Sequence, residues 1–131
     1  MRYLGILISS IILLSACSKS AGVGGKATVS GKVNAIYVNE DSFDTVEVSA
    51  FPETRVYIVY GDGSTQDDDT RTSPDGSFKF EYLNPGDYTV YTYSESLVSP
   101  SEMEEVSAQV TVEKSQDDVS VPTLTVVKYV K

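Results

Sequence analysis

Apolar and polar residues alternate along most of this 131-residue chain. From Ala27 onward, β-branched and aromatic residues recur at every second position, and clusters of Gly, Pro, Asn and Asp separate the alternating runs. A period of two is typical of β-strands, because successive side chains of a strand point to opposite faces of its sheet. No stretch after Ala27 has the period of a helix. The pattern predicts seven strands, at residues 27–38, 45–51, 56–60, 77–82, 87–93, 106–112 and 124–130.

Turn-forming residues lie between these runs. Residues 61–63 (Gly-Asp-Gly), 74–76 (Pro-Asp-Gly) and 84–87 (Asn-Pro-Gly-Asp) contain the types that preset a turn or tolerate a positive φ. Pro122, which cannot donate a hydrogen bond to a neighbouring strand, marks the start or an edge of the last strand. Seven short strands with turns of this kind predict an all-β protein, a single β-sandwich.

The strand at 77–82 predicts part of the core. Its aromatic residues Phe78, Phe80 and Tyr82 alternate with Lys79 and Glu81. We therefore expect the three rings to point into the sandwich and the two charged side chains to face solvent.

Two neighbouring segments carry a resemblance to a known group of domains. Residues 72–80 (Thr-Ser-Pro-Asp-Gly-Ser-Phe-Lys-Phe) and 83–90 (Leu-Asn-Pro-Gly-Asp-Tyr-Thr-Val) resemble the carboxypeptidase regulatory-like domains and their Cna-B and transthyretin-like relatives, and 31–33 (Gly-Lys-Val) fits their opening strand. The resemblance implies a seven-stranded transthyretin-like (prealbumin-like) β-sandwich over residues 27–131. It implies a fold and not a function.

Some Cna-B domains join a lysine on the first strand to an Asn or Asp on the last by an isopeptide bond. Lys32 is the candidate donor in this chain, but residues 124–130 contain neither Asn nor Asp. We therefore expect Lys32 to be solvated and to form no such bond.

The N-terminal residues have a different pattern. Arg2 precedes an apolar run at 4–14, and Leu14-Ser15-Ala16-Cys17 follows. This layout is typical of a secretory signal, and the run falls short of the roughly 20 apolar residues that span a bilayer. The segment resembles bacterial lipoprotein signal peptides, which implies cleavage before Cys17 and a covalent lipid on that residue. This interpretation is favoured over a buried free cysteine or a retained membrane helix.

The lipoprotein resemblance implies a signal peptide at 1–16 and a lipidated Cys17. The small, flexible residues that follow predict a tether, so that 17–26 form the lipidated Cys and tether and 27–131 the domain. In the lipoprotein pattern, Ser18 in place of an acidic residue favours transfer to the outer membrane. We expect a lipid-anchored protein of the bacterial cell envelope that faces the periplasm and contacts the membrane through its lipid.

Charge and composition exclude several function classes. Removing residues 1–16 would take away only Arg2 among the charged residues and change the net charge from −9 to −10. An acidic protein of this kind gains no affinity for nucleic acid from counterion release and is repelled by anionic lipid headgroups. The chain has no histidine, and its one cysteine is the expected lipid site. The usual general base and thiolate nucleophile are therefore missing, so we expect neither an enzyme nor a cofactor.

One acidic segment is a weak candidate for metal binding. Asp62, Asp67 and Asp69 lie in a run whose oxygen atoms suit calcium, although the spacing is not that of an EF-hand. The alternative, which we favour, is a solvated loop that keeps the protein soluble.

The chain is also rich in tyrosine. If Tyr88 and Val90 point inward, Tyr91 and Tyr93 lie on the outer face of the same strand, where rings stack on sugars or pair across strands. Three functions stay open: a non-enzymatic module that contacts another envelope protein or acts as a spacer, a carbohydrate-binding lipoprotein that uses the tyrosine face, and a pilin-like subunit. The third is the weakest, because the first arginine after Cys17 is Arg55, inside the domain.

Overall fold

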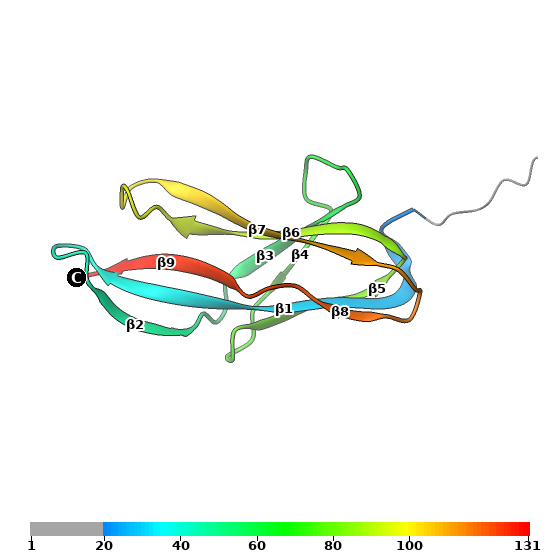
Figure 1. Ribbon diagram of the computed structural model, residues 1–131, viewed down its shortest axis with the longest axis horizontal. Coiled ribbons are helices and arrows are strands. Elements are labelled where there is room, and N and C mark those ends of the chain that lie inside the picture. Colours follow the sequence, from blue (N-terminus) through cyan, green and yellow to red (C-terminus); the bar gives the residue numbers. More distant parts are fainter. Residues whose placement is uncertain (1–19) are drawn as a thin grey trace, which may run out of the picture.

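The structure, a computed structural model, describes residues 20–131 and consists of strands arranged in two sheets (Figure 1). The predicted all-β class is confirmed. The number of strands is nine and not seven: β1 (Val23–Asn39), β2 (Thr45–Ala50), β3 (Arg55–Tyr60), β4 (Asp68–Arg71), β5 (Ser77–Leu83), β6 (Gly86–Glu95), β7 (Met103–Val112), β8 (Asp118–Ser120) and β9 (Leu124–Val130).

The long strand β1 organises the first sheet. Its first half pairs antiparallel with β5 and parallel with β8, and its second half pairs antiparallel with β2 and parallel with β9. Because residues 28–30 pair with β8 while 29–32 pair with β5, these two partners flank β1 on opposite sides; β2 and β9 do the same further along. The second sheet has the order β4-β3-β6-β7 and is antiparallel throughout.

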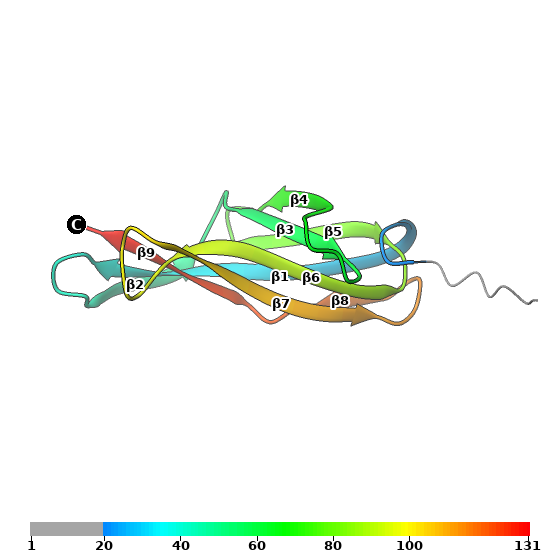
Figure 2. The same ribbon diagram turned by 90° about the horizontal axis from the view of Figure 1, so that it is seen from above.

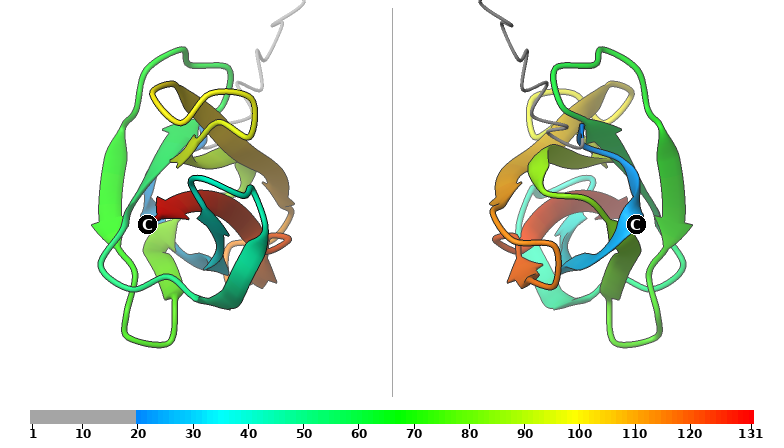
Figure 3. Two further views of the ribbon diagram at one scale, coloured as in Figure 1. Left: turned by 90° about the vertical axis from the view of Figure 1, so that its left-hand side faces the viewer. Right: turned by 90° about the vertical axis from the view of Figure 1, so that its right-hand side faces the viewer.

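The two sheets face each other across one apolar core, as the view along the long axis shows (Figure 3). The inward positions of β1 and β6 alternate with more exposed, mostly polar ones, which is the pattern that the sequence predicts, whereas in β3 the consecutive Ile58 and Val59 are both buried. The largest fully buried apolar side chains of the core are Tyr88, Ile58, Leu83, Val29, Val33, Val56, Val90, Val112 and Val126.

The two strands that the sequence did not predict are short and polar. β4 has the sequence Asp-Asp-Thr-Arg and β8 has Asp-Val-Ser. Neither contains the alternating apolar residues that the prediction used, because each lies at a margin of its sheet where one neighbour supplies the hydrogen bonds. Asp68 and Asp69, expected in an acidic loop, therefore belong to an edge strand.

The inward orientation predicted for Tyr82 is wrong. Phe78 and Phe80 are buried as expected, but Tyr82 is 69% exposed and has a φ of 60°. This left-handed backbone reverses the alternation at the end of β5, so that Leu83 points into the core. The pairing with β1 shifts register at the same place.

The sandwich also begins earlier than predicted. β1 starts at Val23 and not at Ala27, and Ala21 packs against the core. The buried hydroxyl of Tyr88 accepts a hydrogen bond from the Gly22 amide at 2.9 Å and donates one to the Asn84 carbonyl at 2.6 Å. Residues 21–26 are thus part of the fold, which corrects the tether predicted over this stretch.

The predicted signal peptide and the lipid site at Cys17 lie outside the described residues. Residues 20–131 contain no helix long and apolar enough to cross a membrane. Lys32 is exposed, as expected for a solvated side chain.

Candidate functional site

Three tyrosines form a cluster on the outer face of the second sheet. Tyr57 of β3 lies opposite Tyr91 of β6, and their rings stack with centroids 5.1 Å apart at 23°. Tyr93 meets the other two edge to face, with centroids 5.9 Å from Tyr57 and 5.8 Å from Tyr91. The prediction that Tyr91 and Tyr93 lie on the outer face is confirmed, because Tyr88, Val90 and Thr92 of the same strand are buried.

The three rings differ in exposure. Tyr93 is 46% exposed, whereas Tyr57 and Tyr91 are half-buried. Desolvation raises the pKa of the Tyr91 hydroxyl, and the nearby Tyr93 and Glu105 raise it further. Tyr91 therefore acts as the inner member of the cluster, and Tyr93 presents the most accessible ring.

A hollow of about 230 Å³ opens beside Tyr93. It lies where β3 begins and β6 ends, and β9 closes its other side. Its polar and charged members come from all three strands and from the turn before β3. The residues around this space, called here the Tyr93 hollow, are Phe51, Thr54, Arg55, Tyr57, Thr92, Tyr93, Glu95, Met103, Val127 and Lys128.

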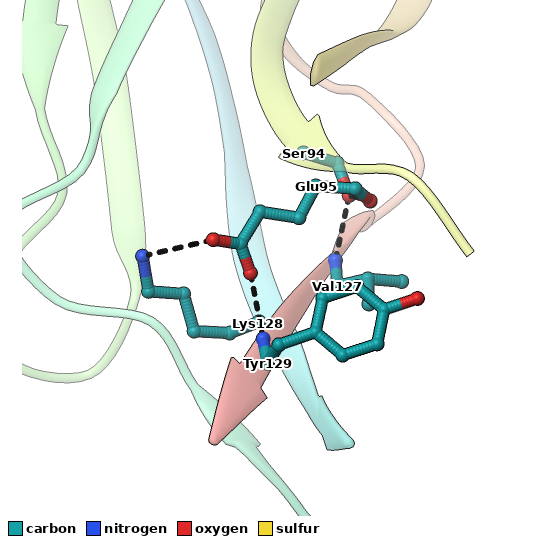
Figure 4. Close-up of polar contacts among 5 residues, drawn as sticks. All are labelled: Ser94, Glu95, Val127, Lys128 and Tyr129. Atoms are coloured by element: carbon teal, nitrogen blue, oxygen red, sulfur yellow. Dashed lines mark hydrogen bonds and ion pairs between the residues drawn. The ribbon is translucent and has the colours of Figure 1, made fainter. Parts of the chain in front are cut away.

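Glu95 holds one wall of the Tyr93 hollow in place (Figure 4). Its carboxylate accepts a hydrogen bond from the Tyr129 amide at 2.6 Å and lies 3.7 Å from the Lys128 ammonium group. The adjacent Ser94 hydroxyl accepts a hydrogen bond from the Val127 amide at 2.7 Å. Side chains at the end of β6 thus bind the backbone of β9 and join the two sheets at this point.

This arrangement also orients the charges that border the hollow. Lys128 is held near Glu95, and Arg55 lies 3.9 Å from Asp69 across the β3–β4 pair. Both cations are half-exposed, so their remaining N–H groups are free to meet a polar ligand. The Tyr93 ring therefore lies near two half-exposed cationic side chains and one carboxylate.

A larger groove of about 930 Å³ lies between β4 and β5. Phe78 and Phe80 line it but are buried, and Lys79 is paired with Glu81 at 2.7 Å. Its exposed ring is Tyr82, for which no aromatic neighbour occurs among residues 20–131. The groove is bigger than the Tyr93 hollow, but its aromatic ring is not held by others, so it is the poorer candidate for recognising a planar or ring-shaped ligand.

The acidic residues that were weak candidates for calcium do not converge. Asp67 uses a carboxylate oxygen to accept a hydrogen bond from the Tyr60 amide at 2.7 Å, and Asp69 faces Arg55. Asp62 is exposed in the preceding turn. Across residues 20–131, no group of three or more His, Cys, Asp or Glu side chains is placed to hold a metal ion.

Calcium at millimolar concentration is therefore expected to leave the melting temperature unchanged, because no preformed set of oxygen ligands would gain affinity on folding. Thermal melts of the full chain with calcium and with the chelator EGTA measure this. A rise in melting temperature that disappears in an Asp67→Asn, Asp69→Asn variant would contradict it.

Comparisons with known proteins assign no family. No family model matches the chain, and no curated protein matches it. Among solved structures, a proposed carbohydrate-binding protein from Pseudomonas aeruginosa is 14% identical, with a TM-score of 0.46 over 82% of this chain and 92% of that one. A DUF3823 family protein from Parabacteroides merdae is 17% identical, with a TM-score of 0.41 over 76% of this chain and 46% of that one. The chain thus spans less than half the length of the second protein.

Several members of the Tyr93 hollow were not predicted. Tyr57 had a usable signal, since the buried Val56 and Ile58 on either side of it place it on the outer face. No local sequence signal points to Glu95 and Lys128, because the contact between these two residues depends on how β6 crosses β9.

Proposed function

We propose that this protein is a lipid-anchored protein of the bacterial cell envelope whose sandwich is a non-enzymatic carbohydrate-binding module. The observation that carries the proposal is the Tyr93 hollow: an accessible ring, buttressed by two others, beside Arg55, Lys128 and Glu95. A sugar ring presents C–H groups on its face and hydroxyls on its rim. The tyrosine suits the first and the charged side chains suit the second.

The size and charge of the site narrow the ligand. Sites that enclose drug-sized molecules are about 300–1,000 Å³, so a hollow of about 230 Å³ suits one sugar unit at a time. Without residues 1–16 the chain carries a net charge of −10, which repels anionic polymers. We therefore take the ligand to be a neutral glycan, bound unit by unit along an open surface.

Anchoring through a lipid on Cys17 agrees with the position of the Tyr93 hollow. β6 runs from the end of the domain near residue 20 toward the opposite end (Figures 1 and 2). Its last residues, Thr92, Tyr93 and Glu95, line the hollow, so the hollow lies at a distance from residue 20. The proposed location is the outer membrane, with the domain on the periplasmic side.

We also propose kinship with the carboxypeptidase regulatory-like and transthyretin-like domains. The residues that carry the resemblance have the roles expected of them: Gly76 turns the chain at a φ of 81°, and Phe78 and Tyr88 are buried. The proposal that the protein is no enzyme rests on the absence of histidine from the sequence and of a cysteine other than Cys17.

Replacing Tyr93 by alanine is expected to weaken glycan binding while leaving stability nearly unchanged, because an exposed ring contributes contact area to the ligand more than to the core. Native affinity electrophoresis of the full chain in gels that contain neutral polysaccharides (a β-glucan, a xylan, a mannan) measures retention, and alginate serves as the anionic comparison. Stacking on one ring is worth about 1–3 kcal/mol, by analogy with aromatic stacking on bases, or roughly a 5- to 150-fold loss of affinity.

Tyr82→Ala is the matched control, since Tyr82 is also an exposed tyrosine but lies on the other sheet, beside the larger groove. It should bind as the parent does. Failure of the parent to be retained by any neutral polysaccharide, or equal losses in both variants, would overturn the proposal.

A further inference from the structure

Among the strands of six or more residues within residues 20–131, β2 is the most exposed. Its partner is β1, and no residue of β2 is buried. Val46 and Val48 are 63% and 59% exposed, although valine is among the residues most often found inside proteins. β2 lies at the margin of its sheet, at the end of the molecule away from residue 20 (Figure 1).

The free side of β2 carries unpaired backbone groups. The Phe51 amide donates to the Val33 carbonyl at 2.9 Å, which sets the phase of the ladder: residues 47 and 49 direct their backbone groups to β1, and Val48 and Ala50 direct theirs outward. Among the hydrogen bonds of residues 20–131 outside the strand ladders, none reaches residues 45–50. An edge of this kind is a template for another strand.

The outer edge of β9, in contrast to that of β2, is covered by side chains. Its outward amides at Val127 and Tyr129 are bound by the side chains of Ser94 and Glu95, so that edge is closed to a further strand (Figure 4). β4, one of the two margins of the other sheet, has four residues with charges at Asp68, Asp69 and Arg71. β2 has neither protection.

The charge around β2 indicates which kind of strand can pair with its free edge. Residues 40–53 contain five acidic side chains and no lysine or arginine. A second copy of β2 would bring the same five acidic side chains to the edge, and bringing like charges together is unfavourable. An anionic membrane surface is repelled in the same way. A partner strand with lysine or arginine is favoured instead.

We infer that β2 docks an extended segment of another protein, in which basic and aliphatic residues alternate. Such a segment adds a strand to the first sheet, and its backbone pairs with Val48 and Ala50. On one face of the sheet, the aliphatic side chains of the docked segment pack beside Val48, which already lies opposite Ile36 of β1. On the other face, the basic side chains of the segment lie beside Glu47. This surface is separate from the Tyr93 hollow, so the inference does not depend on carbohydrate binding.

The test uses the full chain, labelled with ¹⁵N, and a capped nonapeptide of alternating lysine and valine. We expect saturable binding with the largest shifts at residues 45–50 and at least tenfold slower hydrogen exchange at the Val48 and Ala50 amides. The same peptide with glutamate in place of lysine should not bind.

Two pairs of variants keep the test decisive. Val48→Pro removes one outward N–H, which an edge strand tolerates, and should weaken binding at least tenfold, whereas Val48→Thr keeps the N–H and should bind normally. Glu47→Lys should lose the lysine peptide and gain the glutamate peptide. No binding by the parent, equal binding of both peptides, or binding that Val48→Pro leaves unchanged would overturn the inference.

Discussion

Replacing Tyr88 by alanine is expected to lower the free energy of unfolding by about 3–5 kcal/mol, the cost typical of deleting a large buried aromatic ring. Tyr88 is 1% exposed and packs edge to face on Tyr60, with ring centroids 5.8 Å apart. Its hydroxyl also binds both the Gly22 amide and the Asn84 carbonyl. Urea denaturation of the full chain, followed by circular dichroism, measures the change.

Tyr88→Phe separates the ring from the hydroxyl. It keeps the packing but leaves the Gly22 amide without its acceptor, so we expect a loss of about 1–3 kcal/mol. We also expect faster hydrogen exchange at Gly22, because that bond fixes the start of the fold to the core. Tyr82→Phe, at an exposed position, should stay within about 0.5 kcal/mol of the parent. A Tyr88→Phe variant as stable as the parent, with unchanged exchange at Gly22, would refute the role assigned to the hydroxyl.

Replacing Gly31 by alanine is expected to cost about 1–3 kcal/mol through overpacking. A Cβ atom at this position would lie 2.6 Å from the Val121 side chain and 2.7 Å from the ring of Phe78, both closer than van der Waals contact allows. Phe78 is buried and belongs to the core cluster, so moving its ring would disturb the packing of its neighbours. Urea denaturation again measures the effect, and Lys32→Ala at the next, exposed position is the control.

A second substitution makes the test specific. Val121→Ala removes the nearer obstacle, so the double variant Gly31→Ala, Val121→Ala should be more stable than the sum of the two single effects implies. Strictly additive losses would mean that Gly31→Ala destabilises by another route.

The strands that could be predicted are those with strong alternation. In β1, β3 and β6, valine, isoleucine and aromatic residues at every second position reflect one face packed on the core. β4 and β8 lack such a face and depend on a single neighbour, which the local sequence does not reveal. The orientation of Tyr82 was missed for a similar reason: the alternation holds only while φ stays extended, and nothing in the local sequence signals a φ of 60°.

The candidate site was predictable only in part. The phase of β6 places Tyr91 and Tyr93 outward, and the phase of β3 does the same for Tyr57. That Tyr57 stacks on Tyr91 follows from the register between the strands, which the sequence does not contain. The contact of Lys128 with Glu95 depends further on how the two sheets cross.

Carbohydrate recognition at the Tyr93 hollow is tested most directly by titrating the ¹⁵N-labelled full chain with neutral tetrasaccharides prepared from β-glucan, xylan and mannan. The account predicts that one of them shifts the amide signals of Arg55, Tyr57, Tyr93 and Lys128, with saturation, and that Tyr93→Ala removes the response. Absence of any shift with all three sugars, or shifts grouped around Tyr82, would contradict it.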